Sequence, residues 1–128
     1  MIRTLEGEGI KVNATVLMAF GQVVLAAKAN ATYASIFAGR VADEGHDAPA
    51  LIQASVDWLE RWHYKTKIIV GSIRGVIDIQ AAALAGAHII TIPPQFMTKL
   101  VDHKYTRATV YDFVEDAKKV MAQKSLTK

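Results

Sequence analysis

The sequence has no cysteine and only 3 prolines in its 128 residues, and its apolar runs are short. Without cysteine, no disulfide framework can hold the chain together. The runs KIIVGSI at 67–73 and HIITI at 88–92 fall well below the roughly 20 residues that cross a bilayer. No basic and apolar leader opens the chain. We therefore expect a soluble, cytoplasmic protein with no membrane partner.

The sequence carries only a small excess of positive charge. It has 15 Lys and Arg against 12 Asp and Glu, which gives a formal net charge of +3. The basic residues are scattered, and the densest group, Lys118, Lys119, Lys124 and Lys128, lies near the C-terminus, where a solvated helix end explains it. No helix-turn-helix, zinc knuckle or alternation of aromatic and basic residues accompanies the charge. We expect no nucleic-acid partner.

Hydrophobic residues make up 52% of the chain and charged residues 21%. A chain of this length buries about 65 to 70% of its unfolded surface when it folds. No linker or low-complexity segment divides the sequence. It therefore predicts one domain over residues 1–128.

Short β-branched runs alternate with longer segments of helical periodicity. The expected strands are 11–17, 32–37, 65–72 and 88–92, and the expected helices are 22–29, 48–62, 76–84 and 106–121. Strands that alternate with helices of this length predict a parallel sheet with α-helical crossovers. Two helix-to-strand joints, AAKANATYASI and AALAGAHIITI, are also alike, and Asn30 and Gly86 suit the left-handed position that ends a helix. The fold class is therefore α/β, with four β-α units and a C-terminal helix.

Polar side chains lie where these strands end, which is where parallel α/β proteins carry their function. The second strand leads to Arg40, and the third ends at Ser72 and Arg74. The planar, permanently charged arginine fork matches a phosphate, and neighbouring hydroxyls can complete the cradle. The pattern favours an anion site. The residues leave open the alternative that both arginines are solvated surface charges.

Other patterns give no cofactor or metal site. His46, His63, His88 and His103 lack the spacing of metal ligands, and Gly7, Gly9 and Gly45 do not form a phosphate-binding loop. Asn13 and Thr15 on the first strand can be read as a polar pair at a strand start or as a glycosylation acceptor. We expect no metal and no cofactor.

Taken together, these residues resemble the transaldolase family, including its short branch similar to fructose-6-phosphate aldolase. The resemblance rests on EGIKVNATVLMAFGQVVLAAKANATYASIFAGR, KTKIIVGSIRG, AALAGAHIITIP and YDFVEDAKKV, which follow in order over nearly the whole chain. Members of the family are (β/α)8 barrels that move a dihydroxyacetone unit through a Schiff base on a lysine, in sugar-phosphate metabolism such as the pentose phosphate pathway.

The resemblance assigns roles to particular residues. It implies that Arg40, Ser72 and Arg74 hold the substrate phosphate. It implies further that Asn13 and Thr15 orient substrate hydroxyls and a catalytic water. Ser35 and Phe37 would line the pocket. The sequence departs from the family at Ile36, where proline is usual, and at Gly75, where histidine or asparagine is common.

The resemblance covers only the second half of the family fold. It implies half of a (β/α)8 TIM barrel, with the Schiff-base lysine on a strand before these residues. We expect that this chain cannot run the lysine mechanism alone, because Lys11, Lys65 and Lys67 lie at strand starts, away from the arginines. Four parallel strands with open edges need a partner, which predicts a homo-oligomer or a polypeptide that supplies the other half.

Three functions stay open on the sequence. The first is a transaldolase-type enzyme or subunit that acts on sugar phosphates. The second is a sugar-phosphate or phosphate binding module without catalysis. The third is a truncated remnant without a ligand.

Overall fold

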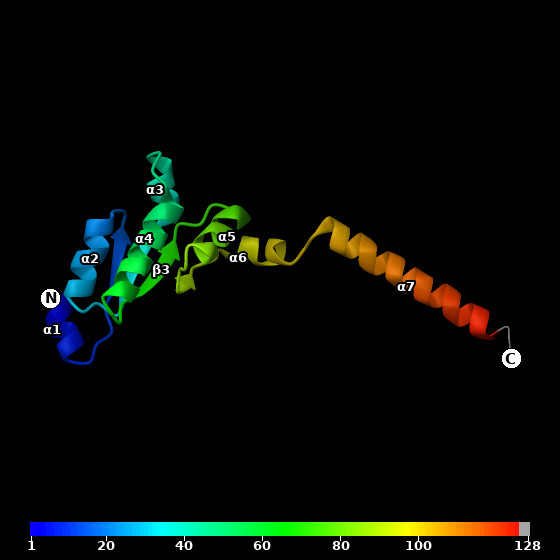
Figure 1. Cartoon of the computed structure of the whole chain (residues 1–128), viewed down its shortest axis with the longest axis horizontal. Helices are drawn as coiled ribbons and strands as arrows, with labels where there is room; N and C mark the ends of the chain where they lie inside the picture. The colour runs from blue at the N-terminus through cyan, green and yellow to red at the C-terminus, as the bar shows by residue number, and fades with distance from the viewer. Residues whose placement is uncertain (126–128) are drawn as a thin grey trace. The chain divides into compact units, whose positions relative to one another are not determined.

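The computed structural model describes residues 1–125, which fall into two compact units, Met1–Pro93 and Pro94–Lys128. The first unit contains α1 (Ile2–Gly7), β1 (Asn13–Leu17), α2 (Phe20–Lys28), β2 (Tyr33–Phe37), α3 (Ala38–Asp43), α4 (Ala48–Arg61), β3 (Lys67–Gly71), α5 (Val76–Leu84) and β4 (Ile89–Ile90). The second contains α6 (Pro94–Met97), the 3₁₀-helix η1 (Thr98–Leu100) and α7 (Lys104–Ser125). Figure 1 labels most of these elements. That residues 1–128 form one domain stays a prediction.

The first unit is built on a parallel sheet in the order β1-β2-β3-β4. Each strand leads through at least one helix to the next, so the predicted α/β class with four β-α units is confirmed. The helix α4 packs against both α2 and α5, and all three helices pack against the strands. The resulting core contains Ile36, Ile68 and Val70, each 0% exposed.

The sheet therefore has a helix-covered face and an opposite face, which we call the open face. Because side chains alternate along a strand, Tyr33, Ser35 and Phe37 share the open face of β2, while Ala34 and Ile36 point to the helices. The register pairs Ser35 with Ile69 and Ile69 with Ile89, so Ile69 and Ile89 lie on the open face of β3 and β4. Ile89 on the open face is 41% exposed, in contrast to the fully buried Ile68 on the other face.

All helices from α1 to α5 end in the same way. In each, two backbone N–H groups beyond the helix bond back to carbonyls of its last turn, as in Ala31 to Ala26 and Asn30 to Ala27. This is the Schellman arrangement, in which the first residue past the cap takes a left-handed conformation. That residue is Gly9, Asn30, Gly45, His63 or Gly86. The left-handed roles predicted for Asn30 and Gly86 are confirmed.

The element boundaries differ in places from those predicted. The helix at 76–84 matches α5, and 22–29, 48–62 and 106–121 correspond to α2, α4 and α7 with shifted ends. The helices α3 and α6 and the 3₁₀-helix were not predicted, because segments this short show no periodicity. The fourth strand, expected at 88–92, has only two residues. Beyond it, Pro93 and Pro94 have no N–H to continue the ladder.

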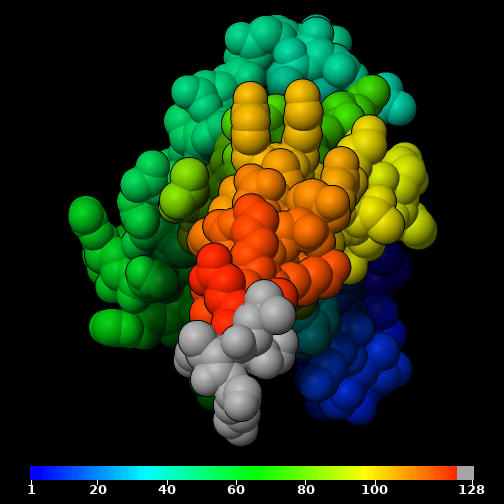
Figure 2. All heavy atoms as spheres, turned by 90° about the vertical axis from the view of Figure 1, so that its right-hand side faces the viewer, coloured from blue at the N-terminus to red at the C-terminus, as the bar shows by residue number. Residues whose placement is uncertain are grey.

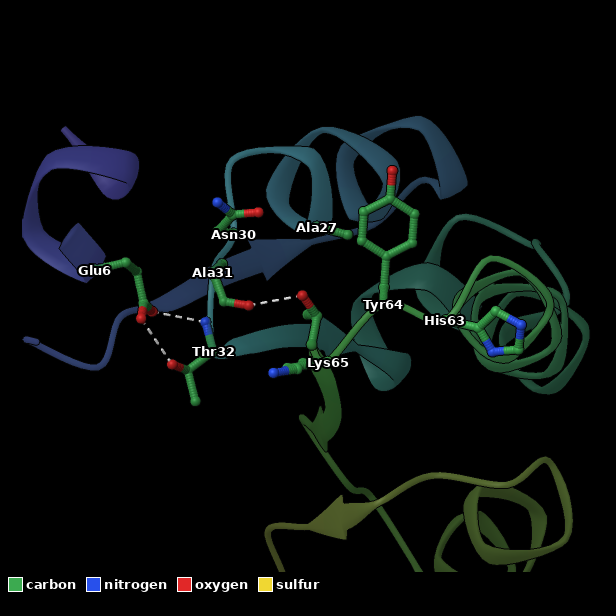
Figure 3. Close-up of a pocket in the computed structure, with 9 residues that line it drawn as sticks. Glu6, Ala27, Asn30, Ala31, Thr32, His63, Tyr64 and Lys65 are labelled. Atoms are coloured by element: carbon green, nitrogen blue, oxygen red, sulfur yellow. Dashed lines mark hydrogen bonds between the residues drawn. The ribbon is translucent and has the colours of Figure 1, made fainter.

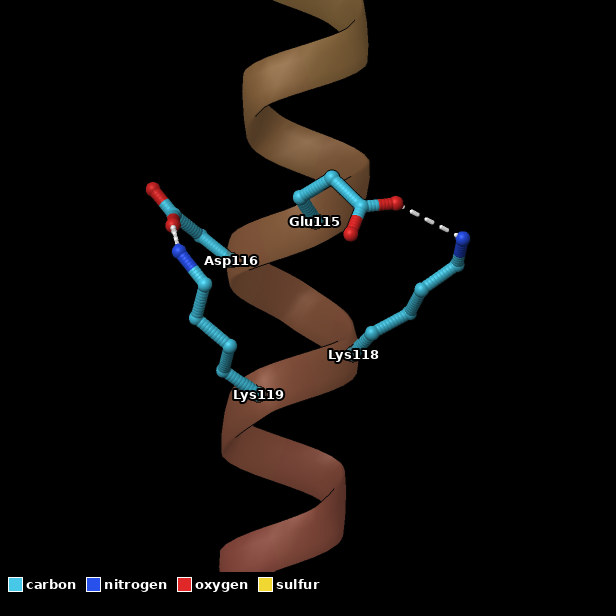
Figure 4. A network of polar contacts seen from close by, with 4 residues as sticks. All are labelled: Glu115, Asp116, Lys118 and Lys119. Carbon is cyan, nitrogen blue, oxygen red and sulfur yellow. Dashed lines mark hydrogen bonds and ion pairs between the residues drawn. The ribbon is translucent and has the colours of Figure 1, made fainter.

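In the second unit, α7 is a 22-residue helix, and its side chains from Lys104 to Gln123 are exposed except the half-buried Glu115. Its apolar positions Val110, Phe113 and Val114 are 56%, 70% and 46% exposed, and the helix appears in orange and red in Figure 2. Lys118 pairs with Glu115 at 2.8 Å, and Lys119 pairs with Asp116 at 3.0 Å (Figure 4). Such pairs three residues apart support the helix itself. The basic residues Lys118 and Lys119 are thus part of a solvated helix, while Lys128 lies outside the described residues.

Candidate functional site

Asn13 and Ser35 meet on the open face of the sheet. They come from neighbouring strands, where Asn13 pairs with Tyr33 in the β1–β2 register. The Ser35 hydroxyl donates a 2.8 Å hydrogen bond to the Asn13 amide oxygen. Because the amide oxygen accepts this bond, the Asn13 NH₂ is the part of the side chain that can donate to another group. Thr15, two residues further along β1, is exposed.

A bulge follows Thr15 on the same strand. The β1–β2 register shifts by one residue between Ala14 and Leu17, and Val16 has a φ of 62°. A β-branched residue rarely takes this left-handed conformation. Strained backbone conformations of this kind persist only where the surrounding structure holds them in place. They are more frequent at functional sites than elsewhere.

Phe37 closes the carboxyl end of β2 on the open face. It pairs in register with Gly71 of β3. A side chain on Gly71 would meet the Phe37 ring at 3.6 Å and the Thr91 hydroxyl at 3.2 Å, so a glycine there lets both groups approach the strand. Thr91 in turn donates to the Val70 carbonyl at 3.0 Å. The predicted pocket residues Ser35 and Phe37 therefore share this face with Thr91.

Ser72 and Arg74 lie against the first turn of α3. A Cβ built on Gly39 would lie 2.1 Å from the Ser72 carbonyl oxygen and 2.7 Å from the Arg74 Nε. Only glycine leaves room for so close an approach. Ser72 itself is in the left-handed region, with a φ of 61°. The structure thus brings together Ser72 and Arg74 and places them beside the residue that precedes Arg40.

Arg40 and Arg74 have different surroundings. The Arg74 Nη2 donates a 2.8 Å hydrogen bond to the Asp43 carboxylate in an ion pair that is about half exposed. The Asp78 carboxylate accepts the backbone N–H groups of Arg74 at 2.8 Å and Gly75 at 3.0 Å, which caps α5. Arg40 is exposed on α3. The roles predicted for Asn13, Thr15, Ser35, Phe37, Arg40, Ser72 and Arg74 stay predictions.

A cavity of about 340 Å³ lies beside this edge, between α3, α4 and α5. Arg74 and Asp43 line it together with His46, Asp47 and Asp78. Sequence reasoning missed the two carboxylates that hold Arg74. The spacing of Gly75 and Asp78 is a recognisable helix-start signal, whereas nothing in the sequence links Asp43 to a residue 31 positions later.

The amino ends of the strands hold a separate cluster around Glu6. Its carboxylate accepts hydrogen bonds from the Thr32 backbone N–H at 2.7 Å and the Thr32 hydroxyl at 3.0 Å (Figure 3). It also accepts a bond from the Val12 backbone N–H at 2.7 Å. The Val12 bond above all, with the Thr32 bonds and the charge of Lys11, lowers the pKa of Glu6, while burial works in the opposite direction. A cavity of about 370 Å³ adjoins Glu6. This cluster ties α1 to the starts of β1 and β2.

The histidines do not gather into a site. Among residues 1–125, no three His, Asp or Glu side chains come close enough to hold a metal ion. His88 has a structural role, because its Nδ1 accepts the Ile68 backbone N–H at 3.1 Å. Burial, together with Lys67, lowers the pKa of His88, and Glu60 opposes the shift. The lowered pKa favours the neutral imidazole that can accept this bond.

The lysines of the first unit lie away from the carboxyl edge of the sheet. Lys67 begins β3, Lys65 shortly precedes it, and Lys11 precedes β1. All three are exposed, as is Lys28 at the end of α2. A Schiff-base lysine needs a dry pocket that makes its amine nucleophilic.

The fold and this edge define a class of protein: a parallel β/α array with an arginine, hydroxyls and an amide at the carboxyl ends of its strands. The chain matches the model of the family described as "Transaldolase/Fructose-6-phosphate aldolase" over residues 1–128. It is 42% identical over 121 residues to the "Probable transaldolase" of Lactiplantibacillus plantarum, covering 94% of this chain and 56% of that protein. The chain belongs to the transaldolase/fructose-6-phosphate aldolase family.

Two further relatives show the same partial coverage. The "Probable transaldolase" of Prosthecochloris aestuarii is 44% identical over 116 residues, which cover 91% of this chain and 52% of that protein. That of Pelotomaculum thermopropionicum is 38% identical over 119 residues, covering 93% and 55%. The chain spans about half the length of the curated relatives it matches. The predicted resemblance and the half-barrel fold are confirmed.

The predicted location is tested only in part. In the portion of the chain that the structure describes, no helix has both the length and the apolar character needed to span a membrane. The cytoplasmic compartment stays a prediction.

Proposed function

We propose that this chain forms the phosphate-binding half of a transaldolase-type site and takes sugar phosphates as ligands. One observation carries the proposal: Ser72 and Arg74 are packed on Gly39 at the carboxyl edge of the sheet. Arginine binds phosphate through charge-assisted, bidentate hydrogen bonds. The neighbouring open face offers the Asn13 amide to the sugar, and the buried Ser35 hydroxyl holds this amide in place.

The proposed reaction is the family's transfer or cleavage of a dihydroxyacetone unit, and this half contributes binding to it. The four lysines of the first unit are exposed and lie away from Arg40 and Arg74. We therefore propose that the amine for the Schiff base comes from outside these 128 residues. The alternative function is a sugar-phosphate binding module that performs no chemistry. The two functions share the phosphate site and differ in whether a covalent adduct can form.

The first test is a titration with fructose 6-phosphate. Arg74→Ala and Arg40→Ala are each expected to weaken binding by about 10- to 100-fold, because losing a charge-assisted hydrogen bond costs about 1.5 to 3 kcal/mol. Arg61→Ala is the matched control, since Arg61 is an exposed arginine at the end of α4 and its loss changes the net charge equally. Isothermal titration calorimetry measures all four proteins.

Two outcomes would contradict the proposal. Equal affinity in the parent and in both arginine variants would show that the cradle does not hold the phosphate. A covalent adduct on the pure chain after borohydride treatment with fructose 6-phosphate, detected by mass spectrometry, would show that the chain carries its own Schiff-base lysine.

For the alternative function, a binding module that performs no chemistry, we propose that the open face is covered by a second copy of this chain, which would bring no Schiff-base lysine of its own. The edge strands β1 and β4 are parallel, so a two-fold axis can place β1 of one copy beside β4 of the other. Ile89 and Val16, at these edges, are 41% and 51% exposed, which leaves apolar surface without cover. The matched relatives are about twice as long, so each has nearly as many residues outside the matched region as within it.

Sedimentation equilibrium tests this arrangement. We expect the parent to be a dimer at micromolar concentration and Ile89→Lys to shift it toward monomer, because a charge would enter the interface. Leu84→Lys is the control, since Leu84 on α5 is 89% exposed. A monodisperse parent monomer would rule out a second copy on the open face. The open face would then be left for a polypeptide equivalent to the other half of the relatives.

A further inference from the structure

Arg74 lies in a seat formed by one face of α3. Gly39 and Asp43 are four residues apart on this helix, so they lie one above the other on the same side. Gly39 provides the space, because any side chain there would meet the Arg74 Nε at 2.7 Å. Asp43 provides the partner, with its carboxylate 2.8 Å from the Arg74 Nη2.

The seat fixes which edge of the guanidinium is used. The Nε and Nη2 nitrogens form one edge of the planar fork; Nη2 donates to Asp43, and Nε lies close to Gly39. The guanidinium has five N–H donors in a rigid arrangement. Because the bond to Asp43 uses Nη2, the edge that includes Nη1 keeps N–H donors for a second partner. That edge has the geometry to hold two oxygens of a phosphate.

The backbone at the base of the side chain is also fixed. The Asp78 carboxylate binds the N–H groups of Arg74 and Gly75 at 2.8 and 3.0 Å. Ser72, two residues earlier, is in a left-handed conformation and packs on Gly39. The arginine is therefore held at its main chain by one carboxylate and at its tip by another.

We propose that Asp43 is a positioning residue that presents Arg74 to the phosphate of the substrate. This inference rests on the proposed function and adds a residue to it. Charge alone predicts the opposite effect: a carboxylate beside an anion site repels the anion, so its removal should tighten binding. Positioning predicts that its removal weakens binding, because the free guanidinium must be ordered when the phosphate binds.

The test is the affinity of Asp43→Ala, which leaves Arg74 no acceptor at this position, for fructose 6-phosphate and for inorganic phosphate. We expect binding to weaken by about threefold to tenfold, the cost of ordering one flexible side chain. Because the ion pair is about half exposed on both sides, we expect little change in the unfolding midpoint. The two ligands separate the phosphate contact from contacts to the sugar.

Asp47→Asn is the matched control. Asp47 lines the same cavity as Asp43 and Arg74, so its replacement removes the same charge from the same surroundings. Its carboxylate accepts the Ala50 backbone N–H at 2.9 Å as the cap of α4, and asparagine caps a helix equally well. We expect unchanged or slightly tighter binding in this variant.

A second measurement does not depend on the ligand. In nitrogen-15 NMR, the Arg74 Nε–H should exchange more slowly and be more ordered than that of the exposed Arg61, and Asp43→Ala should remove the difference. Tighter or unchanged phosphate binding in Asp43→Ala, or an Arg74 signal as mobile as that of Arg61 in the parent, would overturn the inference. If the parent binds no phosphate, the proposed function is wrong, and the NMR comparison still decides whether Asp43 orders Arg74.

Discussion

Gly39→Ala is expected to destabilise the chain and to abolish most of its phosphate binding. The added Cβ would lie 2.1 Å from the Ser72 carbonyl oxygen, 2.7 Å from the Arg74 Nε and 2.8 Å from the Ser72 hydroxyl. The closest of these atoms belongs to the backbone, so α3 or the segment from Ser72 to Arg74 must move. We expect a loss of about 1 to 3 kcal/mol in the free energy of unfolding, as for other overpacked sites.

The same displacement should reach the ligand. Ser72 and Arg74 both move when Gly39 gains a side chain, so we expect an affinity for fructose 6-phosphate at least about tenfold weaker, the loss of one charge-assisted contact. Urea denaturation and calorimetric titration measure the two effects on one preparation. The loss of stability and the loss of affinity need not be equal, because a small shift of the segment from Ser72 to Arg74 can break a bidentate contact.

Gly21→Ala is the control for the glycine substitution itself. Gly21 also lies in a helix, α2, and a Cβ there would meet nothing within 4 Å. Alanine should therefore stabilise this position by up to about 1 kcal/mol, through its higher helix propensity. If Gly39→Ala behaves like Gly21→Ala in stability and in binding, the close packing of α3 on Ser72 and Arg74 has no role.

The features that the sequence predicts correctly are those set by residues close together in the chain. The helix at 76–84 and the left-handed residues Asn30 and Gly86 follow from local rules of periodicity and helix capping. The helix α3 follows β2 without an intervening loop and has only six residues. Such a segment has too few turns to show an apolar face, although it carries Gly39 and Asp43.

The candidate site was predictable to a similar extent. That Asn13 and Ser35 lie together follows from two adjacent parallel strands with polar residues on one face. The ion pair of Asp43 with Arg74 depends on how α3 packs beside β3, which no short pattern encodes. The bulge at Val16 could not be predicted from the sequence either. Valine is common in strands and rarely takes a left-handed conformation.

Ile68→Ala is expected to cause the largest loss of stability. Ile68 is 0% exposed and lies on the central strand β3, on the face covered by helices. The substitution removes buried methyl and methylene groups and leaves a cavity that the sheet cannot easily close. Substitutions of this kind cost about 2 to 5 kcal/mol. That is a large share of the roughly 5 to 15 kcal/mol that holds a typical domain folded.

Ile69→Ala gives the matched comparison, because it removes the same atoms from the next residue of the same strand. Ile69 is on the open face and half-buried, so less apolar surface is lost and the side of the cavity is open. We expect its cost, measured by urea denaturation, to be less than half that of Ile68→Ala. Equal costs at a protein concentration where the chain is monomeric would mean that the open face is as tightly packed as the helix-covered one, contrary to the half-barrel arrangement.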